Sequence, residues 1–493
     1  MNKFLGIDIG TSSVKIVCMN EDGSIARMVS KEYPIYYPRT GWSEQNPNDW
    51  WLAVEEGCKE ILKYIDKTEI HGISFGGQMH GLVVLDKNHE VIRPAILWND
   101  GRSEAECAYL NNCIGKENLT NYCANIAFAG FTAPKLLWMR KHEPDLFYKI
   151  YKIMLPKDYI AYKFTGIFST DVSDASGMLC FDVEHKKWSK EMLRICGIRE
   201  EQLPRIFESY EIVSEILPNI AKQIGLDTTT KIVAGAGDNA AAAIGTGTVG
   251  DGACNISLGT SGTIFISSKK FCVDPYNALH SFAHADGAYH MMGCILSAAS
   301  CNKWWMDEIL CTDDYEKEQV FTDIKNDVYF LPYMMGERSP HNDVLARGAF
   351  VNLSLNTARY EMTQAILEGV AFAIKDCLEV AKSQGIAITR SRICGGGAKS
   401  NVWKEIMANV LNIQIEEIEV DEGPGLGAAI LAAVGCGQYK DVASACEQIV
   451  KVKSVIVPNN VSKYYEKKYK NFTLIYPSLK HFYTKINQRS TNG

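Results

Sequence analysis

The sequence has no excess of basic residues and no long apolar run. Its 493 residues carry 51 lysines and arginines against 58 aspartates and glutamates, a formal net charge of −7. A nucleic-acid binder needs a basic surface that displaces counterions from phosphates, so this class is disfavoured. No apolar run approaches the ~18–20 residues that span a bilayer, and Asp8 interrupts the first apolar stretch too early for a signal peptide. We therefore expect no nucleic-acid partner, no membrane association and a cytoplasmic location.

The cysteine spacing of metal sites and disulfide frameworks is also missing. Sixteen cysteines are scattered along the chain, and no two of them form a Cys-x-x-Cys pair. Such cysteines are usually reduced thiols in a chain without a secretion signal. Histidine and cysteine nowhere cluster at the spacing of zinc ligands. We expect free thiols in the core and no structural zinc.

Three common catalytic motifs do not occur. The chain has no Gly-x-x-x-x-Gly-Lys-Ser/Thr, no Gly-x-Gly-x-x-Gly after its first strand, and no nucleophile elbow of a Ser-His-Asp hydrolase. A P-loop NTPase is thereby excluded. The composition, with 46% apolar and 22% charged residues, is that of a globular protein, and the length predicts two large or three small domains.

What the sequence does contain is a repeated hairpin. Residues 4–17 read as strand, Gly-Thr-Ser turn and strand, and residues 256–267 repeat the pattern, so that Thr11 corresponds to Thr260. The two units lie about half the chain apart, which predicts two halves of similar topology; two coincidental turns are the alternative. Strand and helix patterns alternate between them, as in α/β proteins.

A glycine-rich segment at 245–252 precedes the second hairpin and predicts a domain boundary, dividing the chain into 1–247 and 248–493. The segment also resembles a phosphate loop, but no Lys-Ser/Thr follows it. Helical spacing after a capping serine predicts a helix at 401–411. Aromatic residues from Val461 onward predict an amphipathic C-terminal helix at the end of the second domain.

The tip of the first hairpin has the groups that bind phosphate and metal. Asp8 ends the strand, the Gly-Thr-Ser turn contains Thr11, and Lys15 follows. Backbone N–H groups and hydroxyls can donate to phosphate oxygens, and an adjacent carboxylate can hold Mg²⁺ through water. The second tip, at Thr260, has hydroxyls but no equivalent acid. A hairpin turn without a ligand is the alternative.

Asp238 and a run of three glycines each precede a helix. As an N-cap, Asp238 would be structural. As a carboxylate at a helix N-terminus it stays ionised, and it can accept the proton of a hydroxyl that attacks phosphorus. The glycines at 395–397 permit close approach of a ligand, with Asn401 in the first helical turn; a tight turn is the alternative.

Taken in order, these motifs resemble the FGGY family of carbohydrate kinases over nearly the whole chain. The matching segments are GIDIGTSSVK (6–15), WSEQNP (42–47), GGQMHG (76–81), RPAILWNDGR (93–102), GFTAPKLLW (130–138), LPKDY (155–159), GAGDNAAAA (235–243), SLGTSGT (257–263), SAASC (297–301), LPYMMGERSPHN (331–342) and CGGGAKSNVW (394–403). A second family signature at 348–368 departs only at Asn352, where glycine is usual. Because asparagine tolerates a positive φ, we expect a local adjustment and no loss of activity.

The resemblance implies an α/β fold of two actin-like, ribonuclease-H-type domains with ATP and sugar in the cleft between them. Within the family, the motifs are most similar to those of members that phosphorylate D-xylulose to D-xylulose 5-phosphate. Ribulose, fructose, gluconate and glycerol remain alternative acceptors. A non-catalytic actin-like nucleotide-binding protein is a further alternative, disfavoured because Asp238 and His80 are retained. The implied partners are ATP and a small sugar; a homodimer is open.

The resemblance also implies a role for each matching residue. Asp238 becomes the catalytic base. Asp8 becomes a second catalytic carboxylate, which holds Mg²⁺ through water. The implied sugar contacts are Met79, His80, Trp98, Asp238 and Asn239. The implied nucleotide contacts are Thr11, Lys15, Thr260, Gly397 and Asn401.

Overall fold

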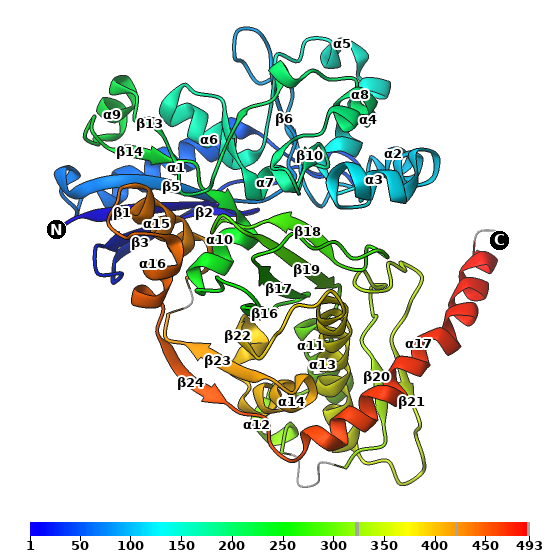
Figure 1. Ribbon diagram of the computed structural model, residues 1–493. Helices are drawn as coiled ribbons and strands as arrows, with labels where there is room; N and C mark the ends of the chain where they lie inside the picture. The colour runs from blue at the N-terminus through cyan, green and yellow to red at the C-terminus, as the bar shows by residue number, and fades with distance from the viewer. Residues whose placement is uncertain (321–324, 421, 491–493) are drawn as a thin grey trace.

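A computed structural model describes residues 1–320, 325–420 and 422–490, and Figure 1 shows two halves, each built around a mixed sheet. The first sheet has the order β13-β14-β5-β1-β2-β3, with β15 beside β5. Its strands are β1 (Lys3–Ile9), β2 (Ser13–Asn20), β3 (Ile25–Glu32), β5 (Ile70–Gly77), β13 (Ile212–Glu215), β14 (Lys231–Val233) and β15 (Ala236–Gly237).

The second sheet has the order β18-β19-β17-β16-β22-β23-β24. Its strands are β16 (Cys254–Leu258), β17 (Gly262–Ser268), β18 (His280–Ala283), β19 (Tyr289–Ile295), β22 (Arg390–Cys394), β23 (Gln414–Ile418) and β24 (Val452–Ile456). The small strands outside both sheets are β4 (Glu44–Gln45), β6 (Val83–Leu85), β7 (Ala95–Ile96), β8 (Lys152–Met154), β9 (Ser169–Asp171), β10 (Phe181–Asp182), β11 (Lys187–Trp188), β12 (Arg205–Phe207), β20 (Tyr329–Leu331) and β21 (Ala349–Val351).

The two sheets share one topology. In the first, the antiparallel run β3-β2-β1 continues into the parallel strands β5 and β14. In the second, the antiparallel run β19-β17-β16 continues into the parallel strands β22 and β23. The hairpins β1–β2 and β16–β17 occupy equivalent places, so the duplication predicted from the repeated Gly-Thr-Ser turn is confirmed.

Helices cover both faces of the first sheet, which explains why every residue of β1 except the partly exposed Asp8 is buried. Alternate residues Leu5, Ile7 and Ile9 pack towards α1 (Pro47–Ile61), α6 (Pro156–Thr165) and α9 (Pro218–Ile224). Phe4 points to the opposite face, which is covered by α10 (Asp238–Gly245) and α15 (Gly423–Gly435). Asp8 shares the face of Phe4, because side chains alternate along a strand.

Helix α15 packs on the first sheet although it lies in the second half of the chain (Figure 1). The approach is close: a Cβ added at Gly6 would lie 1.9 Å from Gly425 O, and one added at Gly427 would lie 1.8 Å from Ala241 O. Only glycine fits at such contacts. The range 248–493 therefore contributes a helix to the sheet of the range 1–247.

The other helices of the first half form a layer with its own apolar core. They are α2 (Glu104–Tyr109), α3 (Lys116–Cys123), α4 (Thr132–His142), α5 (Pro144–Phe147), α7 (Val172–Ser176) and α8 (Lys190–Cys196). The other helices of the second half are α11 (Ala299–Trp304), α12 (Tyr315–Glu318), α13 (Arg359–Ser383), α14 (Asn401–Leu411), α16 (Val442–Ile449) and α17 (Ser462–Ser490).

Three local predictions are confirmed: the N-cap of α14, the C-terminal helix and the positive φ of Asn352. Helix α14 has Ser400 as its N-cap, whose side chain accepts from Trp403 N. The C-terminal helix α17 lies along the second half and buries Tyr465 and Phe472 in its core (Figure 1). Asn352 has φ +69°, the left-handed conformation expected where the family usually has glycine. All sixteen cysteines are free thiols, and nine of them are buried. None of the helices described is both long enough and apolar enough to cross a membrane.

Candidate active site

The strands β1, β5 and β15 run parallel and end at one edge of the first sheet. Ile9 of β1 is paired with Gly77 of β5, which is paired with Gly237 of β15. The residues just before and after these positions therefore lie close together: Asp8 and the Gly-Thr-Ser turn on β1, Met79 and His80 after β5, and Asp238 after β15. The carboxyl ends of parallel strands are a common place for ligand sites in α/β proteins.

Asp8 is a buried acid that lacks a full set of partners. Its Oδ1 atom has no hydrogen-bond partner in the described chain, although a buried carboxylate oxygen normally has one. Burial raises the pKa of Asp8 from 3.8 to about 7, with a further increase from the charge of Asp238 and an opposing effect of Lys15. A cation or its bound water would supply the missing partner.

Asp238 is the first residue of α10, and the N-cap is Gly237, so the alternative of Asp238 as an N-cap is wrong. Its Oδ1 accepts hydrogen bonds from Asn239 N (2.7 Å) and Asn239 Nδ2 (2.9 Å). Burial raises the pKa of Asp238 to about 6, and the two bonds from Asn239 limit the rise. Oδ2 has no hydrogen bond to any described residue and is available to a hydroxyl.

The loop after β5 brings Met79 and His80 to the same place. Asn239 Nδ2 lies 3.8 Å from Met79 Sδ, so this loop contacts the start of α10. His80 Nδ1 lies 2.8 Å from Gly177 O, and because a carbonyl only accepts, Nδ1 carries the proton. Burial holds the pKa of His80 well below 6.5, so the ring is neutral and Nε2 is an acceptor.

The tip of the first hairpin contacts the predicted sugar contact Trp98. The indole Nε1 of Trp98 donates to Thr11 Oγ1 at 3.1 Å, and the Trp98 side chain is 45% exposed. Gln45 Nε2 donates to Thr11 O at 2.7 Å, and this hydrogen bond holds the backbone of the turn. Gln45 belongs to the WSEQNP motif, which was quoted above without a role.

Lys15 is paired with Asp8 across the hairpin, but its ammonium forms an ion pair with Glu422. Glu422 directly precedes α15, so the contact joins the first sheet to the second half of the chain. Sequence reasoning missed Glu422, since no motif marks it. Lys15 could contact a nucleotide only while sharing this carboxylate or leaving it.

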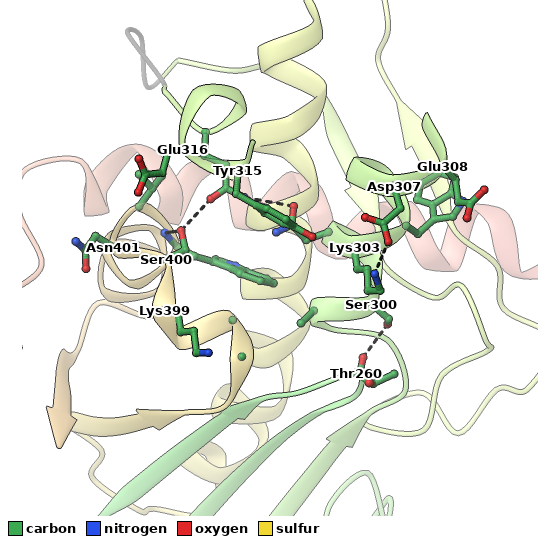
Figure 2. A pocket seen from close by; sticks show the side chains of 18 of the residues that line it. Thr260, Ser300, Lys303, Asp307, Glu308, Tyr315, Glu316, Lys399, Ser400 and Asn401 are labelled. Atoms are coloured by element: carbon green, nitrogen blue, oxygen red, sulfur yellow. Dashed lines mark hydrogen bonds and ion pairs between the residues drawn. The ribbon is translucent and has the colours of Figure 1, made fainter. Parts of the chain in front are cut away.

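The second half contains a pocket of about 1280 Å³ that brings together Thr260, Gly397 and Asn401. Figure 2 shows Thr260, Ser300 and Lys303 on one side and Ser400 and Asn401 on the other. The pocket lies at the carboxyl ends of the parallel strands β16 and β22. Thr11 and Lys15 do not line it, so the predicted nucleotide contacts fall into two groups.

Gly397 fits this place because there is no room for a side chain. It lies in a short 3₁₀ helix, η5 (Gly396–Lys399), and an added Cβ would lie 2.8 Å from Leu258 Cβ and 2.9 Å from Trp403 Cζ3. The chain can therefore turn from β22 into α14 directly over the end of β16. At Gly397 the packing against Leu258 and Trp403 therefore supports the alternative of a tight turn, whereas a Cβ added at Gly396 would have no atom within 4 Å.

Sequence reasoning missed the wall of the pocket formed by residues 299–320. Ser300 Oγ donates to Thr260 O at 2.7 Å, and the aromatic rings of Trp304 and Tyr315 line the same wall. Ser300 lies in the motif SAASC, so its resemblance to the family could have marked it as part of the site. Tyr315 lies in a segment without a motif, so nothing in the sequence marked it.

A buried charged cluster behind Asp238 was also missed. Lys157 Nζ lies 2.7 Å from Asp158 and 2.9 Å from Asp171. Asp171 Oδ2 accepts from Ser173 Oγ at 2.5 Å, and Gly237 N donates to the same Ser173 Oγ at 3.1 Å. The residue before Asp238 is thus anchored to this cluster.

Comparison with known proteins identifies the family. The model of the FGGY family of carbohydrate kinases, N-terminal domain, matches residues 3–245, and that of the C-terminal domain matches residues 254–436. The chain belongs to the FGGY family of carbohydrate kinases. It is therefore a carbohydrate kinase. The predicted α/β fold of two domains is confirmed.

Curated FGGY relatives cover nearly the whole chain. A xylulose kinase of Escherichia coli K12 is 37% identical over 486 residues, 97% of this chain and 99% of the relative. A xylulose kinase of Bacillus subtilis 168 is 35% identical over 475 residues, 94% of this chain and 95% of the relative.

Two solved FGGY structures superpose equally well. A "xyloylose kinase" from Brucella ovis has a TM-score of 0.93 and 36% identity, covering 98% of this chain and 100% of that chain. A gluconate kinase from Lactobacillus acidophilus also has a TM-score of 0.93, with 27% identity, covering 98% and 99%. Overall fold therefore does not separate these two acceptors.

Proposed function

We propose that the protein transfers the γ-phosphoryl group of ATP to the terminal hydroxyl of D-xylulose, giving D-xylulose 5-phosphate and ADP in the cytoplasm. The observation that carries the proposal is the consistent similarity to xylulose kinases over 94–97% of the chain. The contacts around Asp8, His80 and Asp238 supply a physical route for that reaction.

Asp238 acts as the general base. A sugar hydroxyl is a weak nucleophile, so it must be held in line with the phosphorus and lose its proton as it attacks. The unbonded Oδ2 of Asp238 accepts that proton, while Oδ1 is held by Asn239. A pKa of about 6 suits this task, because the group is ionised at neutral pH and still accepts a proton in the transition state.

The nucleotide occupies the pocket beside Thr260, Gly397 and Asn401, with its phosphates extending towards the tip of the first hairpin. Mg²⁺ would be held near Asp8 through water, and the buried, unpartnered Oδ1 fits this role. No group of three or more His, Cys, Asp or Glu side chains in the described chain could enclose a metal. Bound Mg²⁺ would neutralise phosphate charge; Asp8 supplies a negative charge and an acceptor there.

The sugar lies against Met79, His80, Asn239 and Trp98. The neutral His80 presents Nε2, which accepts from a hydroxyl of the sugar. A ketose offers such hydroxyls, whereas a carboxylate would face a lone pair at this position. His80 therefore favours a neutral sugar over gluconate.

One observation favours gluconate as the second candidate. The guanidinium of Arg338 lies 5.3 Å from the centre of the Phe128 ring and has no hydrogen bond or ion pair to the described residues. Its charge reaches His80, because it is one of the effects that lower the pKa of that ring, the smallest of them after burial, Lys135 and His280. An unpaired guanidinium near the sugar site would attract a carboxylate. Gluconate is therefore the alternative acceptor that the site favours most after D-xylulose.

We expect kcat/KM to be highest for D-xylulose in a panel that also contains D-ribulose, L-ribulose, D-fructose, gluconate and glycerol. A site that bonds each hydroxyl discriminates against analogues that leave a buried partner unpaired. Coupled ADP release at saturating ATP and Mg²⁺ gives the ranking. If another compound of the panel exceeds D-xylulose, the assignment of the substrate is wrong while the kinase assignment stands.

A further inference from the structure

His80 has an unusual backbone conformation. Its φ is +69°, in the left-handed region that residues with a Cβ rarely adopt. Non-glycine residues adopt such conformations when their surroundings fix them, and they cluster at functional sites. The contacts that fix His80 are therefore of interest for the sugar site.

Two side chains of α4 hold the carbonyl of His80. Lys135 Nζ donates to His80 O at 2.9 Å, and Thr132 Oγ1 donates to the same oxygen at 3.1 Å. The ring is held from the other side, where Nδ1 donates to Gly177 O at 2.8 Å. Backbone and ring are thus both fixed, which determines the direction of Nε2.

Lys135 is an unusual donor for a structural contact. Its side chain is fully buried, and no carboxylate of the described residues lies within ion-pair distance of it. Burial lowers the pKa of Lys135 to about 7, an effect opposed by Asp100 and reinforced by Arg102. A buried amine without a paired acid is costly, so stability alone does not explain its presence.

The side chain of Lys135 also contacts a second part of the proposed sugar site. Lys135 Nζ donates to Gly130 O at 2.7 Å, and a Cβ added at Gly130 would lie 2.6 Å from Trp98 O. Gly130 therefore packs directly on the backbone of Trp98. Through two carbonyls, Lys135 joins the loop of His80 to the segment that supports Trp98.

We propose that Lys135 is a positioning residue for sugar binding, which acts by fixing the carbonyls of His80 and Gly130 and so aims His80 Nε2 at the sugar. The proposal rests on the proposed function, because it takes His80 as a contact of the sugar. Lys135 itself does not touch the reacting atoms. It sets the geometry of the residue that does.

The test is Lys135→Met, which keeps the length of the side chain and removes its donors. We expect the KM for the sugar to rise about 10–100-fold, as for loss of a charged hydrogen bond, while the KM for ATP stays within about twofold. Lys135→Arg, which keeps a cationic donor, is expected to recover part of the sugar KM. Melting temperature and ATP binding report the fold of each variant.

Lys141→Met is the matched control, because Lys141 lies on the same helix with its side chain 64% exposed and 3.4 Å from Glu106. It is expected to have wild-type KM values for both substrates. An unchanged sugar KM in Lys135→Met would overturn the proposal, as would an equal rise in both KM values with a lowered melting temperature. If Lys135→Met does not fold, Thr132→Val removes the other donor to His80 O, and a wild-type sugar KM in that variant would count against the proposal.

A double-mutant cycle separates action through His80 from a general structural role. In a His80→Ala background, Lys135→Met is expected to change the sugar KM by no more than about threefold, because the ring that Lys135 aims is gone. A full effect in that background contradicts the proposal. All values are measured with the sugar that the wild-type protein prefers, so a wrong substrate assignment leaves this test intact.

Discussion

Replacing Asp238 with asparagine is expected to lower the rate of sugar phosphorylation by about 10²–10⁴ while ATP binding stays intact. The asparagine keeps the shape of the side chain and its place in α10 but cannot accept the proton of the attacking hydroxyl. The measurement is single-turnover phosphoryl transfer at saturating ATP and sugar, with nucleotide affinity determined separately. Near-native turnover would mean that another group takes the proton.

The pH profile of the wild-type protein carries the same information. Because the base must be ionised, kcat/KM for the sugar is expected to fall as pH drops through about 6, the pKa of Asp238. The Asp238→Asn protein should lack this limb. A wild-type profile that is flat through this range would contradict the assignment of the base.

As pH rises through about 6, the free energy of unfolding should fall while activity increases. Burial raises the pKa of Asp238 above its ordinary value of 3.8, so its contribution to stability is present at low pH and is lost as pH rises through about 6. At neutral pH the ionised carboxyl opposes folding by roughly 3 kcal/mol, so Asp238→Asn, whose amide is uncharged, should have a higher melting temperature than the wild type.

Asp145→Asn is the matched control for Asp238→Asn. Asp145 lies in the first turn of α5 but is exposed, so its replacement should change neither activity nor melting temperature.

Asp8→Asn is expected to raise the Mg²⁺ concentration needed for half-maximal rate by about 10–100-fold and to lower turnover, with little change in sugar affinity. The reason is that Asp8 supplies negative charge beside the phosphates, whereas the sugar contacts lie in the segments after β5 and β7 and at the start of α10. Titration of rate against Mg²⁺ at fixed ATP gives the comparison.

Asp22→Asn is the control for this variant, since Asp22 lies exposed in the turn between β2 and β3 of the same sheet, where its carboxylate accepts hydrogen bonds from Ser24. It should follow the wild-type titration. Titration curves for Asp8→Asn that coincide with wild type would remove Asp8 from the metal site.

Local sequence was informative wherever short-range chemistry determines the structure. The Gly-Thr-Ser turns marked both hairpins, Ser400 marked the start of α14, and Asn352 marked a positive φ. These features depend on a few neighbouring residues, so the pattern alone identifies them. The strand ends carrying Asp8 and Asp238 were found in the same way.

Contacts between distant segments were not predictable from patterns. Nothing in the sequence indicates that Glu422 meets Lys15, that Tyr315 lines one pocket with Thr260, or that Lys135 reaches the carbonyl of His80. Each contact joins elements far apart in the chain and depends on how the layers pack. The motif around Lys135 was recognised, but only the structure gives its ammonium two carbonyls as partners.

The central claim is that this chain phosphorylates a terminal hydroxyl of D-xylulose, and the identity of the product tests it most directly. We expect the ³¹P spectrum of protein, ATP, Mg²⁺ and D-xylulose to gain a phosphomonoester triplet, because the two protons of a CH₂–O–P group split the signal. It should coincide with authentic D-xylulose 5-phosphate and should grow about 10²–10⁴ times more slowly with Asp238→Asn. A doublet, or inorganic phosphate as the only new signal besides those of ADP, would contradict the account.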